Sequence, residues 1–311
     1  KEDMFYLRKM SKAINMLRAD TYLYKEFSSI ENLEILGEDF IAQCYRDMPS
    51  ATFRTTIMCK RVEHSEDSFY NGKTDANLYT AVDKTYIDSL GYDMGKLSHV
   101  DCRTDSDIDK SAPLWVAFDA NANINWGVVG QPGVDMQLRI LKSFFVKYDA
   151  RLPELVDNIC EYYSPLRRKE IVFAFDSTFV GNDYGVSSHD FHTIITRCFE
   201  KHGWIVHEKY IGKPWFHPVK QNLINGMFRG KGIYHILINE PNNPDLLVSI
   251  DSAMTVNGTN QKDKTGEKVR ETEENRLEGR TDGSDAFDTL CIAVETERSP
   301  VIVGGGGGGF C

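Results

Sequence analysis

Several features of well-known protein classes are missing from the sequence. No apolar run approaches the ~18–20 residues that a bilayer-spanning helix needs, so we expect no integral membrane protein. The N-terminal residues Lys1 to Met10 are charged and have no apolar core of the kind found in signal peptides. No Walker A phosphate loop occurs, so we do not expect ATP hydrolysis.

Cysteine and basic residues are both in short supply. The seven cysteines are odd in number and none forms a Cys-x-x-Cys pair, which is typical of reduced thiols in a cytoplasm. Lys and Arg number 36 against 46 Asp and Glu, which gives a net charge of −10. A general DNA-coating surface is basic. Any contact with nucleic acid would therefore be local, or would use metal ions that offset carboxylates.

The apolar content is sufficient for a sizeable core. Hydrophobic residues make up 41% of the 311 residues, which excludes a collagen-like or wholly disordered chain. At ~150 residues per domain, this length predicts about two domains. The sequence divides into a mostly helical region over 1–110, an alternation of strand and helix patterns over 111–300, and a flexible glycine-rich tail over 301–311.

The region 111–300 predicts a mixed central sheet flanked by helices, which is an α/β layer fold. The expected strands cover 114–118, 124–129, 137–146, 171–175, 204–210 and 233–238. The expected helices cover 152–163, 191–202, 219–228 and 285–294. Before this region, the apolar spacing indicates helices at 40–45 and 78–90, followed by a polar linker over 91–113.

Four aspartates in this pattern could carry chemistry together. Asp119 ends one expected strand, and Asp176 ends another 57 residues later. Asp285 and Asp288 open the last helix, one turn apart on one face. Functional groups gather past the carboxyl ends of strands in open α/β sheets, so these carboxylates could meet. Oxygen ligands without a His or Cys cluster suit Mg²⁺ or Mn²⁺, and two such ions commonly serve phosphodiester cleavage.

Each of these signals has a structural alternative. An Asp after a strand is more often a turn former or a helix cap, and paired Asp residues at a helix start are usually a cap and a dipole partner. Asp183 could be an accessory ligand or a turn residue beside two glycines. A zinc site would need histidines that helix and strand breaks mostly separate, namely His189, His192, His202, His207 and His217.

The order of the acidic motifs resembles that of the ribonuclease-H-like nuclease superfamily. Within it, residues from about 48 to 295 resemble the C-terminal nuclease part of a tailed-phage terminase large subunit. The stretch Val116 to Asp119 resembles the first acidic motif of that family, and Val172 to Asp176 resembles the second. Gly283 to Leu290 resembles the third, with Asp285 and Asp288 on its acidic positions.

This resemblance implies an endonuclease that cuts double-stranded viral DNA during genome packaging. Asp119, Asp176, Asp285 and Asp288 would hold two Mg²⁺ or Mn²⁺ ions. Residues 1–110 would be a helical connector or remnant of the ATPase domain. The implied partners are double-stranded DNA, a portal protein and a small terminase subunit, in a motor that could be a homo-oligomer in the host cytoplasm.

Basic side chains near this site are candidate contacts to the DNA backbone. They are Lys213, Lys220, Arg229, Lys262 and Lys264. Their alternative is an ordinary helix surface and a solvated hairpin tip. The Asp-x-x-Asp spacing also resembles the Holliday-junction resolvase branch of the superfamily. The other functions considered are therefore a resolvase-like or transposase-like nuclease, and a non-catalytic assembly module of a packaging motor.

Overall fold

The computed structural model describes residues 29, 33–47, 67–91, 100–148, 151–181, 190–256, 259–268, 270–272 and 276–297. Three predicted features lie outside these residues, namely Asp183, His189 and the tail over 301–311. No helix in the described ranges has both the length and the apolar character needed to cross a membrane.

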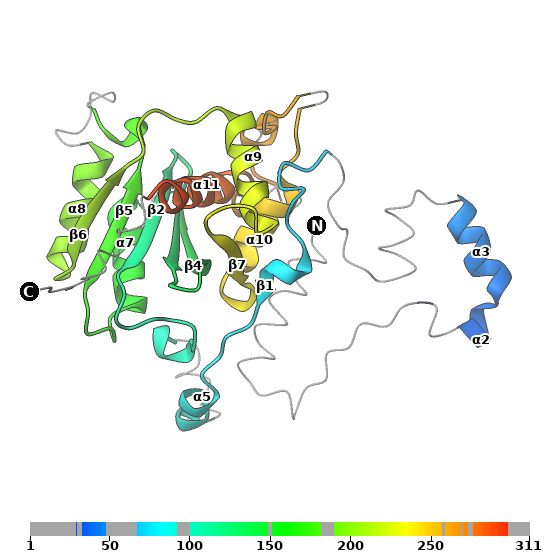
Figure 1. The fold of residues 1–311 in the computed structure, drawn as a ribbon, viewed down its shortest axis with the longest axis horizontal. Coiled ribbons are helices and arrows are strands. Elements are labelled where there is room, and N and C mark those ends of the chain that lie inside the picture. The colour runs from blue at the N-terminus through cyan, green and yellow to red at the C-terminus, as the bar shows by residue number, and fades with distance from the viewer. Residues whose placement is uncertain are drawn as a thin grey trace, which may run out of the picture.

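A mixed sheet of seven strands forms the centre of the molecule (Figure 1). The strands are β1 (Leu78–Tyr79), β2 (Leu114–Ala120), β3 (Ile124–Pro132), β4 (Gln137–Lys147), β5 (Glu170–Phe175), β6 (Ile205–Tyr210) and β7 (His235–Asn239). Their order across the sheet is β1-β7-β4-β3-β2-β5-β6. Strand β3 runs antiparallel to both of its neighbours, and the other paired strands run parallel.

Helices cover both faces of this sheet. The helices are α2 (Leu33–Leu36), α3 (Glu38–Asp47), α5 (Lys84–Leu90), α7 (Leu152–Tyr162), α8 (Phe191–Lys201), α9 (His217–Phe228), α10 (Pro244–Ser252) and α11 (Asp282–Glu295). Helices α7 and α8 pack into one hydrophobic core, and α9, α10 and α11 pack into the core on the opposite face. In Figure 1, α11 crosses the middle of the sheet, with α9 and α10 beside it.

The first five residues of β2, Leu114 to Phe118, are all apolar because both faces of the strand are buried there. Trp115 and Ala117 belong to the core under α11, whereas Val116 and Phe118 belong to the core under α7 and α8. Side chains alternate along a strand. Asp119 therefore continues the side of Ala117 and faces α11.

The prediction of a mixed central sheet flanked by helices is confirmed. The expected helix over 78–90 is partly wrong, because its first two residues form β1 and pair with β7. The helix begins only at Lys84, after the Asp83 side chain accepts a hydrogen bond from the Tyr86 amide at 2.9 Å. Helix α10 was not predicted.

The segment 91–113 was predicted to be a polar linker, and its described part is instead packed against the domain. Asp105 is buried and accepts hydrogen bonds from the Tyr162 hydroxyl at 2.6 Å and the Asn242 amide at 2.8 Å. Asp107 accepts one from the Tyr79 hydroxyl at 2.5 Å. These acidic side chains thus satisfy phenols and amides inside the fold, which a count of charged residues does not reveal.

Candidate active site

The candidate site lies where the carboxyl ends of β2 and β5 meet the N-terminal turn of α11. Strands β2 and β5 pair in parallel with Ala117 opposite Ala174, so their carboxyl ends lie at the same edge of the sheet. Asp119 and Asp176 each stand two residues beyond this pair. The register therefore places the two predicted aspartates on neighbouring strand ends beneath α11.

A glycine lets α11 approach the sheet closely at this point. A Cβ atom on Gly283 would lie only 3.0 Å from the Trp126 ring, which is itself fully buried. The Ser284 amide also donates a hydrogen bond to the Ser249 hydroxyl of α10 at 2.9 Å. The first turn of α11 is therefore held on two sides, which fixes the position of the aspartates that it carries.

Helix α11 carries three aspartates at three-residue steps: Asp282, Asp285 and Asp288. Each such step turns the side chain by about 60° around the axis of a helix with 3.6 residues per turn. The three carboxylates consequently fan out from the β2 side of the helix to the α9 side. Asp285 occupies the middle and takes part in the contacts on both sides.

On the β2 side, Asn121 joins two carboxylates. Its Nδ2 donates to Asp119 Oδ2 at 2.9 Å and to Asp282 Oδ1 at 2.5 Å. Burial, Asp285 and Asp282 raise the pKa of Asp119 well above its usual value. Burial and the nearby Glu267 raise the pKa of Asp282 to about 6. These carboxylates are crowded, and a cation between them would relieve their mutual repulsion.

On the α9 side, Lys262 holds Asp288 inside the protein. The Lys262 Nζ lies 2.8 Å from Asp288 Oδ2 and 2.7 Å from the Tyr70 hydroxyl, and both Lys262 and Asp288 have fully buried side chains. The Tyr70 hydroxyl donates to Asp288 Oδ1 at 2.6 Å. Burial and the negative charges of Asp288 and Asp285 raise the pKa of Tyr70, so the phenol stays protonated and acts as a donor. The negative charge of Asp288 is therefore balanced within the chain, by the Lys262 ammonium.

Asp285 connects the two sides through three lysines. Its Oδ1 lies 2.7 Å from Lys262 Nζ and 3.8 Å from Lys220 Nζ, and its Oδ2 forms an ion pair with Lys264. Although burial raises its pKa, these three positive charges outweigh that effect and hold the pKa of Asp285 well below its usual range. Asp285 is consequently ionised at neutral pH.

Asp176 stands apart from this network. Its side chain caps a short 3-10 helix, η4 (Ser177–Phe179), and accepts hydrogen bonds from the Thr178 amide at 2.8 Å and the Thr178 hydroxyl at 2.5 Å. Within the described ranges, no hydrogen bond or ion pair links it to the other three predicted aspartates. Its metal-binding role stays a prediction, supported by its position at the neighbouring strand end.

The five predicted DNA-contact residues divide into two groups. Lys220, Lys262 and Lys264 lie in the site and form ion pairs with Asp285 or Asp288. Lys213 is exposed, between β6 and α9. Arg229 is also exposed and donates to the Asn71 side chain at 2.7 Å.

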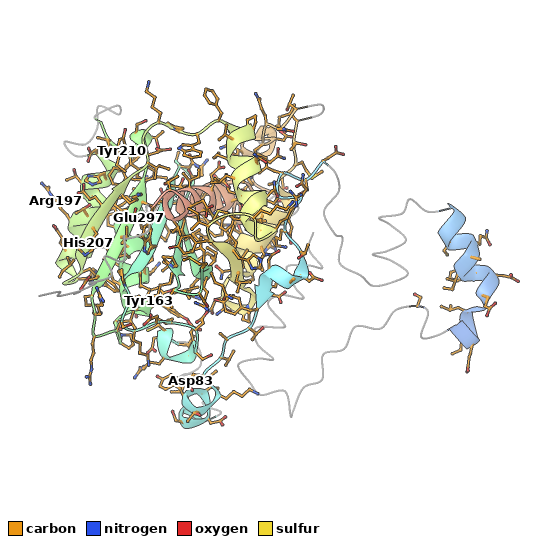
Figure 2. All side chains as sticks on the ribbon, in the orientation of Figure 1. Asp83, Tyr163, Arg197, His207, Tyr210 and Glu297 are labelled. Carbon is orange, nitrogen blue, oxygen red and sulfur yellow. The ribbon has the colours of Figure 1, made fainter. Side chains whose placement is uncertain are left out.

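The described histidines are separated from one another. His192 pairs with Glu208 at 3.0 Å, His202 with Asp157 at 2.6 Å, and His207 with Glu170 at 3.4 Å. His207 lies at the edge of the sheet away from α11, as Figure 2 shows. His217 Nδ1 accepts a hydrogen bond from the Lys262 amide at 2.9 Å. Each of these rings has a local structural partner.

Sequence reasoning missed Asp282, Asn121 and Tyr70 as members of the site. Asp282 could have been found, because it extends the Asp285–Asp288 spacing by one more step of three. Tyr70 offered no such signal, since it meets Asp288 across 218 positions of sequence.

The donor atoms in the site suit a hard cation. The carboxylates of Asp119, Asp282 and Asp285 offer only oxygen ligands, which fits Mg²⁺ or Mn²⁺. Over the part of the chain that the structure describes, no three His, Cys, Asp or Glu side chains are already placed to hold one ion together. The donors of Asn121, Lys262 and Lys264 instead contact the carboxylates.

Comparisons with known proteins give partial structural matches but no sequence relative. No family model matches the chain, and no curated protein matches its sequence. RuvC from Thermus thermophilus in complex with a Holliday junction substrate aligns with 11% identity and a TM-score of 0.28, over 58% of this chain and 91% of that one. The yeast mitochondrial Holliday junction resolvase aligns with 7% identity and a TM-score of 0.30, over 58% and 79%. The function proposed below therefore rests on the side chains of this chain.

Proposed function

We propose that this protein is a metal-dependent endonuclease that hydrolyses phosphodiester bonds in DNA. The observation that carries the proposal is the meeting of Asp119, Asp282 and Asp285 at the end of β2 and the start of α11. The pKa of Asp119 and that of Asp282 are raised, first by burial and then by the negative charges beside them. Crowding of this kind is unfavourable without a cation and favourable with one.

Asp119, Asp282 and Asp285 would hold Mg²⁺ or Mn²⁺, and Asp176 would contribute to a second ion. The bound metal supplies charge stabilisation at the phosphate and a water of lowered pKa. Lys262 and Tyr70 fix the orientation of Asp285 and Asp288 through their hydrogen bonds. Lys264 and Lys220 place positive charge at the mouth of the site, where it attracts a DNA phosphate.

The more specific biological setting that we propose is cleavage of double-stranded viral DNA during genome packaging in the host cytoplasm. Its support is the resemblance of the three acidic motifs to those of terminase nucleases. A portal protein and a small terminase subunit would then be the partners. Cleavage of four-way junctions in preference to linear duplex would favour the resolvase-like alternative instead.

The experiment is cleavage of supercoiled plasmid by the wild-type chain and by Asp119→Asn. We expect wild type to nick and linearise plasmid with Mg²⁺ or Mn²⁺ and to stop in excess EDTA. The cleavage rate of Asp119→Asn should be about a hundredfold or more below that of wild type, because the metal would no longer stabilise the transition state by several kcal/mol. The matched control is Asp135→Asn, since Asp135 lies in the turn between β3 and β4 and pairs with Arg139 of β4.

Thermal unfolding gives a second readout. Mn²⁺ should raise the melting temperature of wild type and of Asp135→Asn, because a ligand stabilises only the state that binds it. The rise should be much smaller in Asp119→Asn. Without metal, Asp119→Asn should melt at or above the wild-type temperature, since one crowded charge is gone. Plasmid cleavage by Asp119→Asn at the wild-type rate would refute the proposed site.

A further inference from the structure

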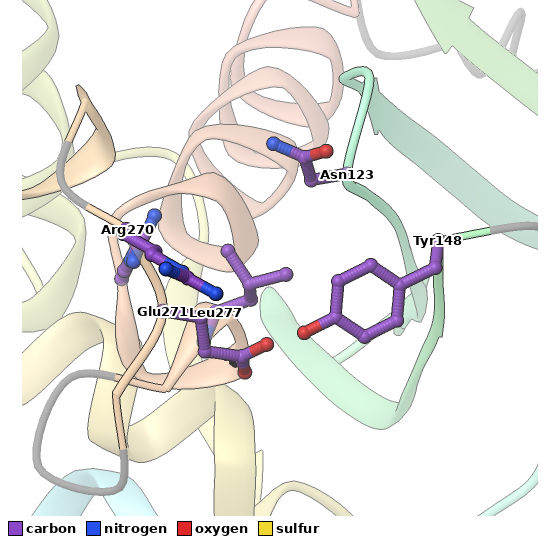
Figure 3. Close-up of a pocket in the computed structure, with 6 residues that line it drawn as sticks. Asn123, Tyr148, Arg270, Glu271 and Leu277 are labelled. Carbon is purple, nitrogen blue, oxygen red and sulfur yellow. Dashed lines mark hydrogen bonds between the residues drawn. The ribbon is translucent and has the colours of Figure 1, made fainter.

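A cavity of about 400 Å³ lies beside the first turn of α11. Two residues line it from strand ends and four from the segment that leads into α11 (Figure 3): Asn123 and Tyr148, and Arg270, Glu271, Leu277 and Arg280. Asn123 is two residues from Asn121, and Arg280 is two residues before Asp282. The cavity therefore adjoins the carboxylates of the candidate active site.

The two walls of the cavity are tied together within the chain. Lys147, the last residue of β4, forms ion pairs with Glu271 at 2.9 Å and with Glu278. The Tyr148 amide donates to the Asn123 carbonyl at 2.9 Å. The cavity is thus formed before any ligand enters it, which reduces the ordering that binding requires.

Tyr148 is held in a backbone conformation that tyrosine rarely adopts. Its φ is 56°, in the left-handed region, and its side chain is 53% exposed. Figure 3 shows the phenol ring reaching into the cavity across from Glu271. An exposed aromatic ring at a strained backbone position beside a candidate active site indicates a role in binding.

The chemistry of the walls matches a nucleotide. The Tyr148 ring offers a surface on which a base can stack, and such stacking does not depend on the identity of the base. Arg270 supplies positive charge for a phosphate, while Asn123 can pair with the edge of a base. The volume lies within the usual range of small-ligand sites.

We propose that this cavity binds one unpaired nucleotide of the DNA, beside the phosphate that is cleaved. The inference rests on the proposed nuclease function and specifies its substrate. A base inside a continuous duplex is stacked between its neighbours and cannot reach the Tyr148 ring. The favoured substrate is therefore double-stranded DNA with an unpaired nucleotide at the cleavage point, such as a bulge or a flap.

The test measures binding without metal, so that cleavage does not intervene. Two fluorescent duplexes, identical except for one extra unpaired adenine, are titrated with protein in EDTA and followed by fluorescence anisotropy. We expect the bulged duplex to bind about tenfold tighter, as one base–aromatic stack provides. The ratio of affinities should fall towards one in Tyr148→Asn, which removes the ring but keeps a residue that tolerates positive φ.

Two further variants complete the design. Arg270→Gln should also lower the ratio, because it removes a positive charge from an exposed side chain of the cavity wall. Tyr210→Ala is the matched control, since Tyr210 is 55% exposed at the end of β6 and does not line the cavity. It should keep the wild-type ratio.

The assignment of the cavity would be overturned if wild type bound the two duplexes with equal affinity. It would also be overturned if Tyr148→Asn kept the wild-type ratio of affinities. Plasmid nicking by wild type in Mn²⁺ tests the nuclease function separately. Nicking without a preference for the bulge refutes the cavity assignment alone. A Tyr148-dependent preference without nicking supports the cavity and refutes the nuclease function.

Discussion

Lys262 is a fully buried ammonium in contact with two carboxylates and a phenol. Its Nζ also lies 4.9 Å from the centre of the Phe69 ring and 5.0 Å from that of Tyr70. A buried carboxylate without a counter-charge is strongly unfavourable, and Asp288 has no exposed surface through which water could compensate. Lys262 therefore makes it possible for the start of α11 to carry a charged residue into the core.

Replacement of Lys262 should destabilise the fold strongly. Lys262→Met keeps the length of the side chain but leaves Asp288 and Tyr70 without the ammonium, and removal of one partner of a buried pair costs about 3–5 kcal/mol. Urea unfolding measures this change. Lys264→Met is the control, because the Lys264 side chain is 40% exposed and its pairs should contribute less than about 1 kcal/mol. Equal losses for the two variants would contradict the buried network.

Asp282 should make stability depend on pH. Its pKa of about 6 in the fold lies above the ~3.9 of an unfolded aspartate, so the ionised group costs stability at high pH. This cost is fully present above the folded pKa and is relieved as the pH falls through about 6 towards ~4. Without metal, Asp282→Asn should be more stable than wild type by about 1–3 kcal/mol at alkaline pH.

Chemical unfolding of both proteins across the acidic and alkaline range checks this expectation. The extra stability of Asp282→Asn over wild type should shrink as the pH is lowered. It should be gone once Asp282 of wild type is protonated in both the folded and the unfolded state. A gain that does not vary with pH would show that Asp282 does not titrate in this way.

At the scale of elements, the contact between α11 and β3 depends on a missing side chain. Gly283→Ala would place a Cβ 3.0 Å from the buried Trp126 ring, and overpacking of this kind costs about 1–3 kcal/mol. Gly226→Ala in α9 is the matched control, because nothing lies within 4 Å of its Cβ position. In the control, the free energy of unfolding should rise by about 0.5–1 kcal/mol because alanine has the higher helix propensity. Thermal or urea unfolding should therefore show that Gly283→Ala is less stable than wild type and that Gly226→Ala is more stable.

The main strands and helices of the sheet could be predicted because each repeats its pattern over many residues. Strand β2 is apolar on both faces, and α7 shows one apolar face. Strand β1 could not be predicted, since two residues contain no period and their pairing depends on β7. The position of Asp119 could be predicted from the strand that it ends. The contact between Lys262 and Tyr70 could not be predicted, because it joins residues 192 positions apart.

At the scale of the whole molecule, the charge of −10 opposes binding to DNA. Several basic groups near the site are paired with Asp285 or Asp288, which reduces the net positive charge that they offer to phosphates. We expect weak binding that falls steeply as salt rises, because counterion release supplies most of the affinity.

Lys213 should contribute to this binding, since it is exposed between β6 and α9. Lys213→Gln should reduce the slope of log affinity against log salt by about one, as the loss of one phosphate contact does. Lys201→Gln is the control, because Lys201 is also exposed but lies in the last turn of α8, which leads into the opposite end of β6. Anisotropy titrations at several salt concentrations measure both slopes, and equal slopes would exclude the Lys213 contact.

The hydrogen bond between Tyr70 and Asp288 has a consequence for the time at which the site forms. It joins residues 218 positions apart, and ribosomes add roughly 5–20 residues per second, so Tyr70 is synthesised roughly 10–40 s before its partner. During that interval the chain lacks the helix that brings Asp282 and Asp285 to Asp119. A nascent chain would therefore carry an incomplete carboxylate set, and the proposed nuclease activity would require that α11 has left the ribosome.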